Sequence, residues 1–379
     1  MNILEEIQNC PVEWKELGDK NVAKLSRGKV MSKQFLEENK GEFPVYSSQT
    51  ANNGEIGRIS SFEHDGEYIT WTTDGANAGT VFYRKGKFSI TNVCGLVEIN
   101  SDQLLTKFVY YYLTISTKKY VSSGMGNPKL MSNVMGKIKI PILPLEIQEK
   151  IVQILDKMTE YVTELTSELT SRKKQYSYYR DKLLSFEDEV YQVEWKILKD
   201  IATLKNGKDW KNLPIGDIPV YGSGGEMGEF VADYSYDKPT VLIPRKGSIS
   251  NLFYLEKAFW NVDTIYYTEI DETKIIPKYF YYYLTTVNLE EMSTNPTRPS
   301  LTQAILDKIK IPVPSLEIQS RIVQVLDNFD TVCNDLNIGL PKEIELRQKQ
   351  YEYFREKLLT FVAEGVYTDS GQWHGRNLT

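Results

Sequence analysis

Apolar residues in the middle of the chain follow a heptad pattern that predicts a long helix. They are spaced by four and three residues in alternation, which is the seam of a coiled coil. The seam residues are Ile151, Leu155, Met158, Val162, Leu165 and Leu169, followed by Arg172, Tyr176, Tyr179 and Leu183. Charged residues fill most other positions, and Pro144 stands just before the expected start. The pattern predicts one helix over residues 145–186, roughly 60 Å long at about 1.5 Å per residue.

A second seam with the same spacing lies near the end of the chain. Its residues are Ile322, Leu326, Phe329, Cys333 and Leu336, then Tyr351, Phe354, Leu358 and Phe361. Between these two groups stand four extra residues around Gly339 and Pro341, which should break or kink the helix. Because each helix alone would expose an apolar stripe, we expect the two to pack as an antiparallel coiled coil.

The segments 12–144 and 193–315 show a different pattern, with short β-branched and aromatic runs divided by glycines. The runs are YITWTT from Tyr68, GTVFY from Gly79, TVLIP from Thr240 and DTIYYTEI from Asp263. Such runs are typical of strands. Each segment also contains an aromatic run expected to be helical, Phe108–Ile115 and Tyr279–Thr286. The fold class predicted is therefore α+β, with two similar globular domains separated by two long helices.

The chain is an internal repeat. KFVYYYLT from Lys107 returns as KYFYYYLT from Lys278, and KIKIPILPLEIQEKIVQILD from Lys137 returns as KIKIPVPSLEIQSRIVQVLD from Lys308, both 171 residues later. RKKQYSYYRDKLLSF from Arg172 returns as RQKQYEYFREKLLTF from Arg347. The stretches after each LEIQ are close copies, whereas those before it share only landmarks. A pseudo-twofold arrangement is therefore expected. The closely copied stretches after each LEIQ would perform the same task twice, and the diverged stretches before it would perform two related tasks.

These patterns divide the chain into six segments. They are an N-terminal segment 1–11, a first globular domain 12–144, a first helical spacer 145–189, a second globular domain 193–315, a second helical spacer 316–363 and a polar tail 364–379. The sequence does not say whether the N-terminal segment packs beside the last helix.

Composition narrows the class of protein. With 379 residues, 41% of them hydrophobic and 25% charged, the chain is expected to fold into more than one core. No run is long enough for a membrane span, and no signal peptide is recognisable. Its three cysteines are far apart and lack metal-site or disulfide spacing, so a cytoplasmic location is expected.

Charge is distributed unevenly between the two globular segments. The net charge is −6, but residues 12–144 hold 17 basic and 13 acidic side chains, whereas residues 193–315 hold 14 and 16. A nucleic-acid ligand therefore requires one basic face on the second domain, or a basic partner that contacts the phosphates.

The sequence offers no catalytic centre. It contains neither GxxxxGK[ST] nor GxSxG, only two histidines, and no acidic cluster that occurs in both halves. GSGG at Gly222–Gly225 lacks the context of a dinucleotide site and is interpreted as a turn. Two equivalent domains without a shared acid, base or metal ligand indicate binding, so no catalytic residue, no metal and no cofactor are expected in this chain.

The repeated motifs resemble those of a known family. IP.P..EIQ..I...LD opens each spacer, and RKKQY.YYR.KLL or RQKQY.YFR.KLL closes it. This arrangement resembles specificity subunits of type I restriction-modification systems over roughly residues 12–363. The resemblance implies a non-catalytic subunit with two target-recognition domains that binds a bipartite sequence in double-stranded DNA. It also implies two modification subunits as partners, restriction subunits in the full complex, and S-adenosylmethionine, ATP and Mg bound by those other chains.

The residues expected to contact DNA are polar or basic and lie in loops of the two globular domains. Asn, Gln and Arg can make paired contacts with adenine or guanine edges, and Lys suits phosphates. In the first domain they are Ser48, Gln49, Thr50, Asn52, Asn53, Thr73, Asp74, Asn77, Asn127 and Lys129, with Arg84, Lys85 and Lys87 as a basic hairpin tip. In the second domain they are Ser223, Arg245, Lys246, Ser248, Ser250, Asn251, Asn295, Thr297 and Arg298.

Several features allow two interpretations. The tyrosine rows at Tyr110–Tyr112 and Tyr281–Tyr283 suit base stacking or, more simply, packing in the domain core. Tyr178 and Phe361 suit either a partner surface or the seam. The tetrads at 163–166 and 167–170 suit a ruler between the two readers or an ordinary charged stretch of coiled coil. A coiled-coil scaffold with two protein- or carbohydrate-binding heads and a self-sufficient modifying enzyme remain as alternative functions.

Overall fold

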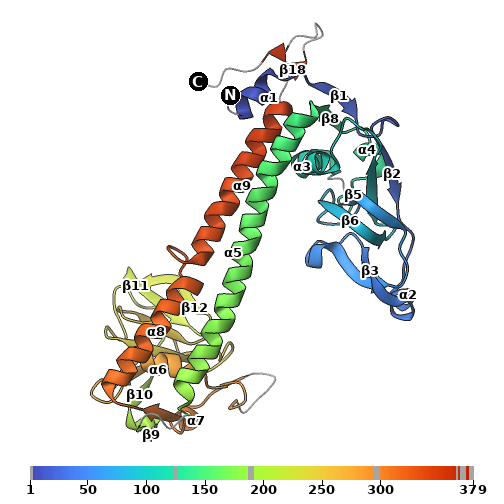
Figure 1. Ribbon diagram of the computed structural model, residues 1–379. Coiled ribbons are helices and arrows are strands. Elements are labelled where there is room, and N and C mark those ends of the chain that lie inside the picture. Colours follow the sequence, from blue (N-terminus) through green and yellow to red (C-terminus); the bar gives the residue numbers. More distant parts are fainter. Residues whose placement is uncertain are drawn as a thin grey trace. The chain divides into compact units, whose positions relative to one another are not determined.

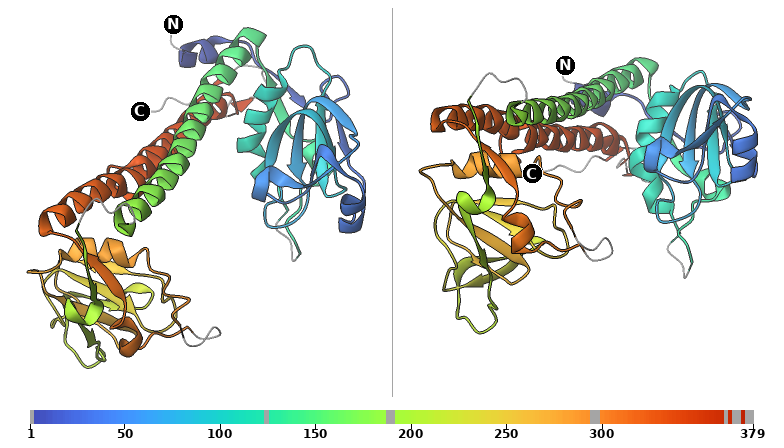
Figure 2. Two further views of the ribbon diagram at one scale, coloured as in Figure 1. Left: turned by 60° about the horizontal axis from the view of Figure 1, so that its bottom comes forward. Right: turned by 90° about the horizontal axis from the view of Figure 1, so that it is seen from below.

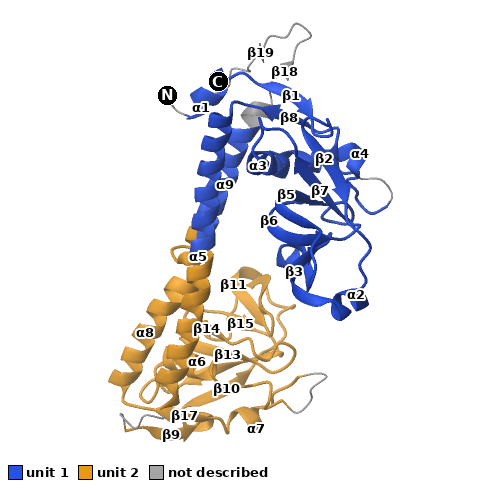
Figure 3. Cartoon of the chain, turned by 45° about the vertical axis from the view of Figure 1, so that its right-hand side comes forward, with its two compact units in different colours: residues 1–164, 344–379 blue, residues 165–343 orange. Residues whose placement is uncertain are grey.

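The computed structural model describes residues 3–122, 126–186, 192–293, 299–363, 366–367 and 373–374. The chain forms two compact units, which Figure 3 colours separately. Unit 1 comprises residues 1–164 and 344–379, and unit 2 comprises residues 165–343. The long helix α5, Leu145–Ser185, contributes residues to both units. The single helix predicted over this stretch is confirmed to within one residue at its end.

Unit 1 contains a six-stranded sheet in the order β2-β7-β5-β6-β3-β4 (Figure 1). Its strands pair antiparallel except β3 with β6, which are parallel. The elements of this unit before α5 are α1 Ile3–Asn9, β1 Glu13–Glu16, β2 Ala23–Arg27, α2 Lys33–Glu38, β3 Lys40–Tyr46, η1 Ala51–Gly54, β4 Glu55–Ile59, β5 His64–Thr72, β6 Val81–Ile90, β7 Cys94–Ile99, α3 Thr106–Ser116, η2 Thr117–Tyr120, α4 Ser132–Met135 and β8 Lys139–Ile142. At the end of the chain follow α9 Leu340–Ala363, β18 Val366–Tyr367 and β19 Trp373–His374.

The core of unit 1 lies between the sheet and α3, the aromatic helix that the sequence predicts (Figure 2). Phe108 and Leu113 of α3 are fully buried with Trp71 of β5. Tyr111 and Tyr112 are only 3% and 5% exposed. The core interpretation is therefore confirmed for Tyr111 and Tyr112, since rings so buried have no face free for a base.

Unit 2 repeats this plan with a more divided sheet. Its strands form a four-stranded sheet in the order β10-β16-β13-β14, a three-stranded sheet in the order β12-β11-β15, and the pair β17-β9. The elements are β9 Glu194–Ile197, η3 Leu198–Asp200, β10 Ala202–Asn206, β11 Ile215–Gly222, β12 Gly225–Val231, β13 Thr240–Pro244, β14 Phe253–Leu255, β15 Trp260–Asn261, β16 Ile265–Ile270, α6 Pro277–Leu284, α7 Gln303–Leu306, β17 Lys310–Val313 and α8 Leu316–Asn334. Tyr279 and Tyr282 of α6 are buried, as their counterparts in α3 are. The turn expected at Gly222–Gly225 is the hairpin turn between β11 and β12.

Seam residues of the spacer helices contact one another inside each unit. In unit 1, Ile151 and Leu155 of α5 share one hydrophobic cluster with Leu358 and Leu359 of α9 and with Ile7 of α1. In unit 2, the rings of Tyr176 and Tyr179 on α5 lie 6.4 and 5.8 Å from that of Phe329 on α8.

The interruption expected in the second helix is present. α8 ends at Asn334, and α9 begins at Leu340, directly before Pro341. Pro fits the first turn of a helix because the amide hydrogen it lacks would have no partner there. The sequence therefore placed the break correctly. Among the helices of the described residues, none combines the length and the apolar character needed to cross a bilayer.

Candidate nucleic-acid interface

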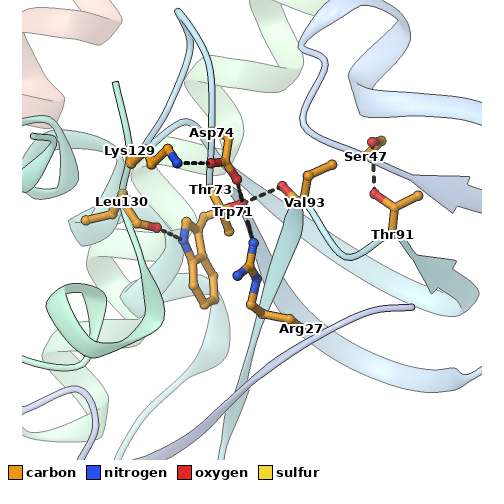
Figure 4. Close-up of polar contacts among 9 residues, drawn as sticks. All are labelled: Arg27, Ser47, Trp71, Thr73, Asp74, Thr91, Val93, Lys129 and Leu130. Carbon is orange, nitrogen blue, oxygen red and sulfur yellow. Dashed lines mark hydrogen bonds and ion pairs between the residues drawn. The ribbon is translucent and has the colours of Figure 1, made fainter. Parts of the chain in front are cut away.

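Two loops predicted to contact DNA meet at the end of β5 in unit 1 (Figure 4). The backbone N–H of Leu130 donates to the carbonyl of Thr73 at 2.9 Å, and the Trp71 Nε1 donates to the carbonyl of Leu130 at 2.9 Å. The carboxylate of Asp74 lies 3.7 Å from the Lys129 Nζ. Asn127, in the same loop as Lys129, is exposed. The structure thus brings together Asp74 and Lys129, which are far apart in sequence.

Arg27, at the end of β2, completes this cluster and was missed by the sequence analysis. Its Nη2 donates to the Thr73 Oγ1 at 3.1 Å and lies 3.6 Å from Asp74 Oδ2. Thr73 itself is fully buried, so its hydroxyl holds the guanidinium and is closed to solvent. Arg27 is about one-third exposed, which leaves part of a pre-oriented guanidinium open to a ligand.

The segment from Ser48 to Asn53 adjoins the same cluster. Asn77 Nδ2 donates to the Thr50 Oγ1 at 3.1 Å, which ties this segment to the turn after β5. Asn52 and Asn53 both have left-handed backbone angles, with φ of 48° and 53°, a conformation that Asn tolerates better than most residues. Both Asn side chains are exposed. Gln49 is held by its own loop, since its Nε2 donates to the Glu55 carbonyl at 2.5 Å.

The expected basic hairpin tip at Arg84, Lys85 and Lys87 is wrong. These residues lie inside β6, which continues from Val81 to Ile90 beside β5. Gly86 suggested a turn, but it pairs in register with Gly66 of β5, and positive φ angles at both glycines let the two strands continue past this point.

Arg84 is a buried side chain of the sheet, with only 3% of its surface exposed. Its Nη2 donates to the Asn53 carbonyl at 2.8 Å, its Nε donates to the Thr70 Oγ1 at 3.1 Å, and its guanidinium carbon lies 3.6 Å from the centre of the Tyr46 ring. Burial lowers the pKa of Arg84 below its ordinary value. We therefore assign Arg84 a supporting position behind the Asn52–Asn53 turn. Lys85 pairs with Glu67 at 2.9 Å, and Lys87 lies over the Phe62 ring.

In unit 2 the corresponding cluster surrounds Arg245. Its Nη1 donates to the Asn206 Oδ1 at 3.1 Å, and its guanidinium carbon lies 5.1 Å from the centre of the Tyr266 ring. The backbone N–H of Leu301 donates to the Arg245 carbonyl at 2.9 Å, as Leu130 does to Thr73 in unit 1. Lys246 lies 3.7 Å from the Asp263 carboxylate.

Other predicted residues of unit 2 lie around this cluster. A Cβ built on Gly247 would lie 3.4 Å from the Ser223 Oγ, so the hairpin turn at Ser223 adjoins the loop after β13. Ser248 and Asn251 are exposed in that loop, and Ser250 donates from its Oγ to the Glu290 Oε1 at 2.5 Å. Asn295, Thr297 and Arg298 lie outside the described residues.

Both clusters hold a guanidinium between the ends of two equivalent strands. The strand that supplies the arginine in one unit supplies its partner in the other. In unit 1 the arginine ends β2 and its hydroxyl partner follows β5; in unit 2 the arginine follows β13 and its amide partner, Asn206, ends β10. Both strand ends continue as Gly-Lys, at Gly28 and Gly207. Guanidinium groups suit paired contacts with a guanine edge or with phosphate. Each unit therefore presents one half-open, pre-oriented group of this kind.

No metal centre accompanies these clusters in the part of the chain that the structure describes. There, no three His, Cys, Asp or Glu side chains lie together so as to hold a metal ion. Burial raises the pKa of the Cys94 thiol to about 12, so this cysteine stays protonated at neutral pH and is a poor nucleophile.

Comparison with known proteins identifies the family. A family model described as the type I restriction modification DNA specificity domain matches twice, at residues 11–172 and 192–346. A putative type I specificity subunit of Mycoplasma pneumoniae is 30% identical over 361 residues, which cover 90% of this chain and 96% of the relative. A putative type I restriction enzyme specificity subunit of Haemophilus influenzae is 32% identical, with 94% of this chain and 97% of the relative covered.

Solved structures agree at the level of the fold. The S subunit of a type I restriction-modification system from M. genitalium superposes with a TM-score of 0.63 at 21% identity, covering 92% of this chain and 96% of its own. The alternative of a scaffold with protein- or carbohydrate-binding heads gains no support from these matches. With family matches on both repeats and relatives aligned over nearly their whole length, the chain belongs to the specificity subunits of type I restriction-modification systems, which recognise DNA and carry no catalytic centre.

Proposed function

We propose that this chain reads two separated short DNA sequences, one with residues 12–144 and one with residues 193–315, and directs partner subunits to the combined site. The observation that carries the proposal is the equivalent placement of Arg27 and Arg245, each held by a polar partner beside a loop fixed through Leu130 or Leu301. Each domain alone reads only a few base pairs, with about 1–3 kcal/mol of discrimination per pair. Two linked readers add their discrimination and raise each other's local concentration.

The spacers 145–189 and 316–363 are proposed to pair as an antiparallel coiled coil with pseudo-twofold symmetry. Contacts inside each unit support this: Arg347 lies 5.2 Å from the Tyr161 ring in unit 1, and Tyr176 meets Phe329 in unit 2. Because the two spacers present closely similar surfaces, two copies of one modification subunit suit them as partners.

We further propose that restriction subunits join the full complex, and that S-adenosylmethionine, ATP and Mg are bound by those partner chains in the cytoplasm. Tyr178, 61% exposed on α5, belongs to the proposed docking surface. The side chain of Phe361 lies outside the described residues.

A binding measurement tests the proposal directly. The chain, purified with its modification subunits, should bind its bipartite target with an affinity that falls steeply as salt rises, since each neutralised phosphate contributes a slope of about −0.9 in a log–log plot. The target is found by mapping methylated adenines in the host genome, and affinity is measured by fluorescence anisotropy. Equal affinity for this target and for scrambled DNA would refute sequence reading. Methylation by the chain alone would favour the self-sufficient enzyme.

Replacing Arg245 by Ala should weaken binding to the second half-site by about 5- to 150-fold, which corresponds to the roughly 1–3 kcal/mol expected for the contact of a guanidinium with a base edge. Discrimination at the first half-site should not change. Arg321→Ala removes the same charge from an exposed position on α8, where the side chain is 74% exposed, and serves as control. Arg27→Ala should show the reverse pattern. If each arginine variant weakens binding to both half-sites by the same factor, the guanidinium groups contact only phosphate.

A further inference from the structure

The repeated motif LEIQ contains a glutamine whose side chain is completely buried in both copies. Gln148, in the first turn of α5, accepts from the backbone N–H of Leu105 at 2.9 Å and donates to the carbonyls of Gln103 and Leu143, each at 2.7 Å. Leu105 is the residue directly before α3, and its side chain supplies no cap. Gln148 therefore satisfies a free amide at the start of the helix that carries the core of the recognition domain.

Gln319 does the same in unit 2. It accepts from the backbone N–H of Ile276 at 2.8 Å and donates to the carbonyls of Lys274 at 3.0 Å and Pro314 at 2.9 Å. Ile276 directly precedes α6, the counterpart of α3. All three hydrogen bonds of the first glutamine thus recur at equivalent positions.

A second polar contact joins the same helices, at an aspartate eight residues further along. Asp156 accepts from the Lys107 Nζ and the Tyr111 hydroxyl, both at 2.6 Å. In unit 2, Asp327 lies 3.0 Å from the Lys278 Nζ and accepts from the Tyr282 hydroxyl at 2.5 Å. The motif LEIQ…LD therefore places an amide and a carboxylate on one face of the spacer helix, both directed at the recognition domain.

The buried glutamine and the aspartate together form two anchors between the spacer helix and the recognition domain, and two anchors restrict the domain more than one does. Eight residues of helix separate the anchors by about 12 Å, so that together they prevent the recognition domain from pivoting about either contact. The apolar packing of α3 and α6 favours contact but is largely non-directional, whereas hydrogen bonds to a charged group require a defined geometry.

We propose that Gln148 with Asp156, and Gln319 with Asp327, are positioning residues that fix the orientation of each recognition domain on its spacer helix and thereby restrict the gap length that the protein accepts. This inference rests on the proposed reading of a bipartite target. None of the four residues belongs to the loops proposed to contact DNA, so they act on the distance between half-sites and leave the bases read unchanged.

The test compares Asp156→Asn and Tyr111→Phe with the wild-type chain, each in complex with its modification subunits. Methylation rates are measured on DNA carrying both half-sites with the native gap and with one base pair more or fewer. The ratio of native-gap to altered-gap rates should fall about tenfold in Asp156→Asn, as expected for the loss of one charge-assisted hydrogen bond. The penalty for a base change within either half-site should remain at its wild-type value. Glu149→Gln removes the same charge from an exposed position on the same helix and should leave both ratios unchanged.

The possible outcomes separate this inference from the proposed function. If the wild-type complex discriminates gap lengths and both variants discriminate as sharply, the positioning role is wrong and bipartite reading stands. If the wild-type complex ignores gap length, the proposed function fails as well. Should Asp156→Asn not fold, Tyr111→Phe decides alone, because it removes one hydroxyl and leaves the ring in the core; Tyr282→Phe repeats the test in the second domain.

Discussion

Deleting Thr163–Thr166 should shorten the preferred gap between the half-sites by one to two base pairs and leave both half-sites unchanged. These four residues lie inside the uninterrupted helix α5. Their removal shortens it by about 6 Å, against about 3.4 Å per base-pair step. Leu165 is the one buried side chain of the four, so the deletion changes length more than packing. Methylation of targets with graded gaps measures the shift.

A variant of unchanged length is the control for this deletion. Thr163 and Thr166 are exposed, and replacing both by Ala keeps Leu165 in the seam and the helix at full length. This variant should keep the wild-type gap. If the deletion also keeps it, the tetrad is an ordinary stretch of coiled coil and the spacer does not act as a ruler.

Replacing Gly28 or Gly207 by Ala should lower the free energy of unfolding of its own unit by about 3 kcal/mol or more, the upper range for overpacking. A Cβ at Gly28 would lie 1.9 Å from the Ile90 carbonyl oxygen, and a Cβ at Gly207 would lie 2.1 Å from the Val262 carbonyl oxygen. Because both contacts are with backbone, no side-chain rotation relieves them. Urea unfolding followed by near-UV circular dichroism measures the loss.

The same substitutions should abolish reading of one half-site each, because each glycine directly follows the strand end that places Arg27 or Asn206. Gly224→Ala is the matched control, since a Cβ there meets nothing within 4 Å. A Gly207→Ala chain with wild-type stability and wild-type binding would show that the strand end adapts and that its close approach has no role in the site.

Much of the fold follows from periodicity, and the site follows from it only in part. Heptad spacing predicts α5 and the break before α9, because burial of one helix face imposes a regular pattern on the residues. The role of Arg27 could not be predicted in this way because its partner Thr73 is 46 residues away in sequence. A local sequence pattern does not predict a contact at that separation. The position of Arg84 was predicted wrongly for a related reason. The basic run around Gly86 has the composition of a turn, but it forms a strand because Gly86 pairs with Gly66 of β5.

The N-terminal segment shows the same limit. No pattern in residues 1–11 predicts which residues they contact. In the structure, Ile7 is buried in the cluster that contains Leu358, and Glu6 pairs with Lys150 at 2.7 Å. Contacts between segments far apart in sequence depend on the assembled fold. A helix of seven residues is too short for its hydrophobic pattern to predict which element it packs against.

The opposite origin of the two guanidinium groups limits how recognition domains can be recombined. A hybrid that joined the early strands of one domain to the later strands of the other would inherit one of two faulty pairs. It would hold both Arg27 and Arg245, two like charges in one place, or Asn206 facing Thr73 with no guanidinium. Crossovers inside a domain should therefore yield chains that fold but read poorly. Crossovers within the spacer helices keep each pair together, so new specificities should arise by exchange of whole domains.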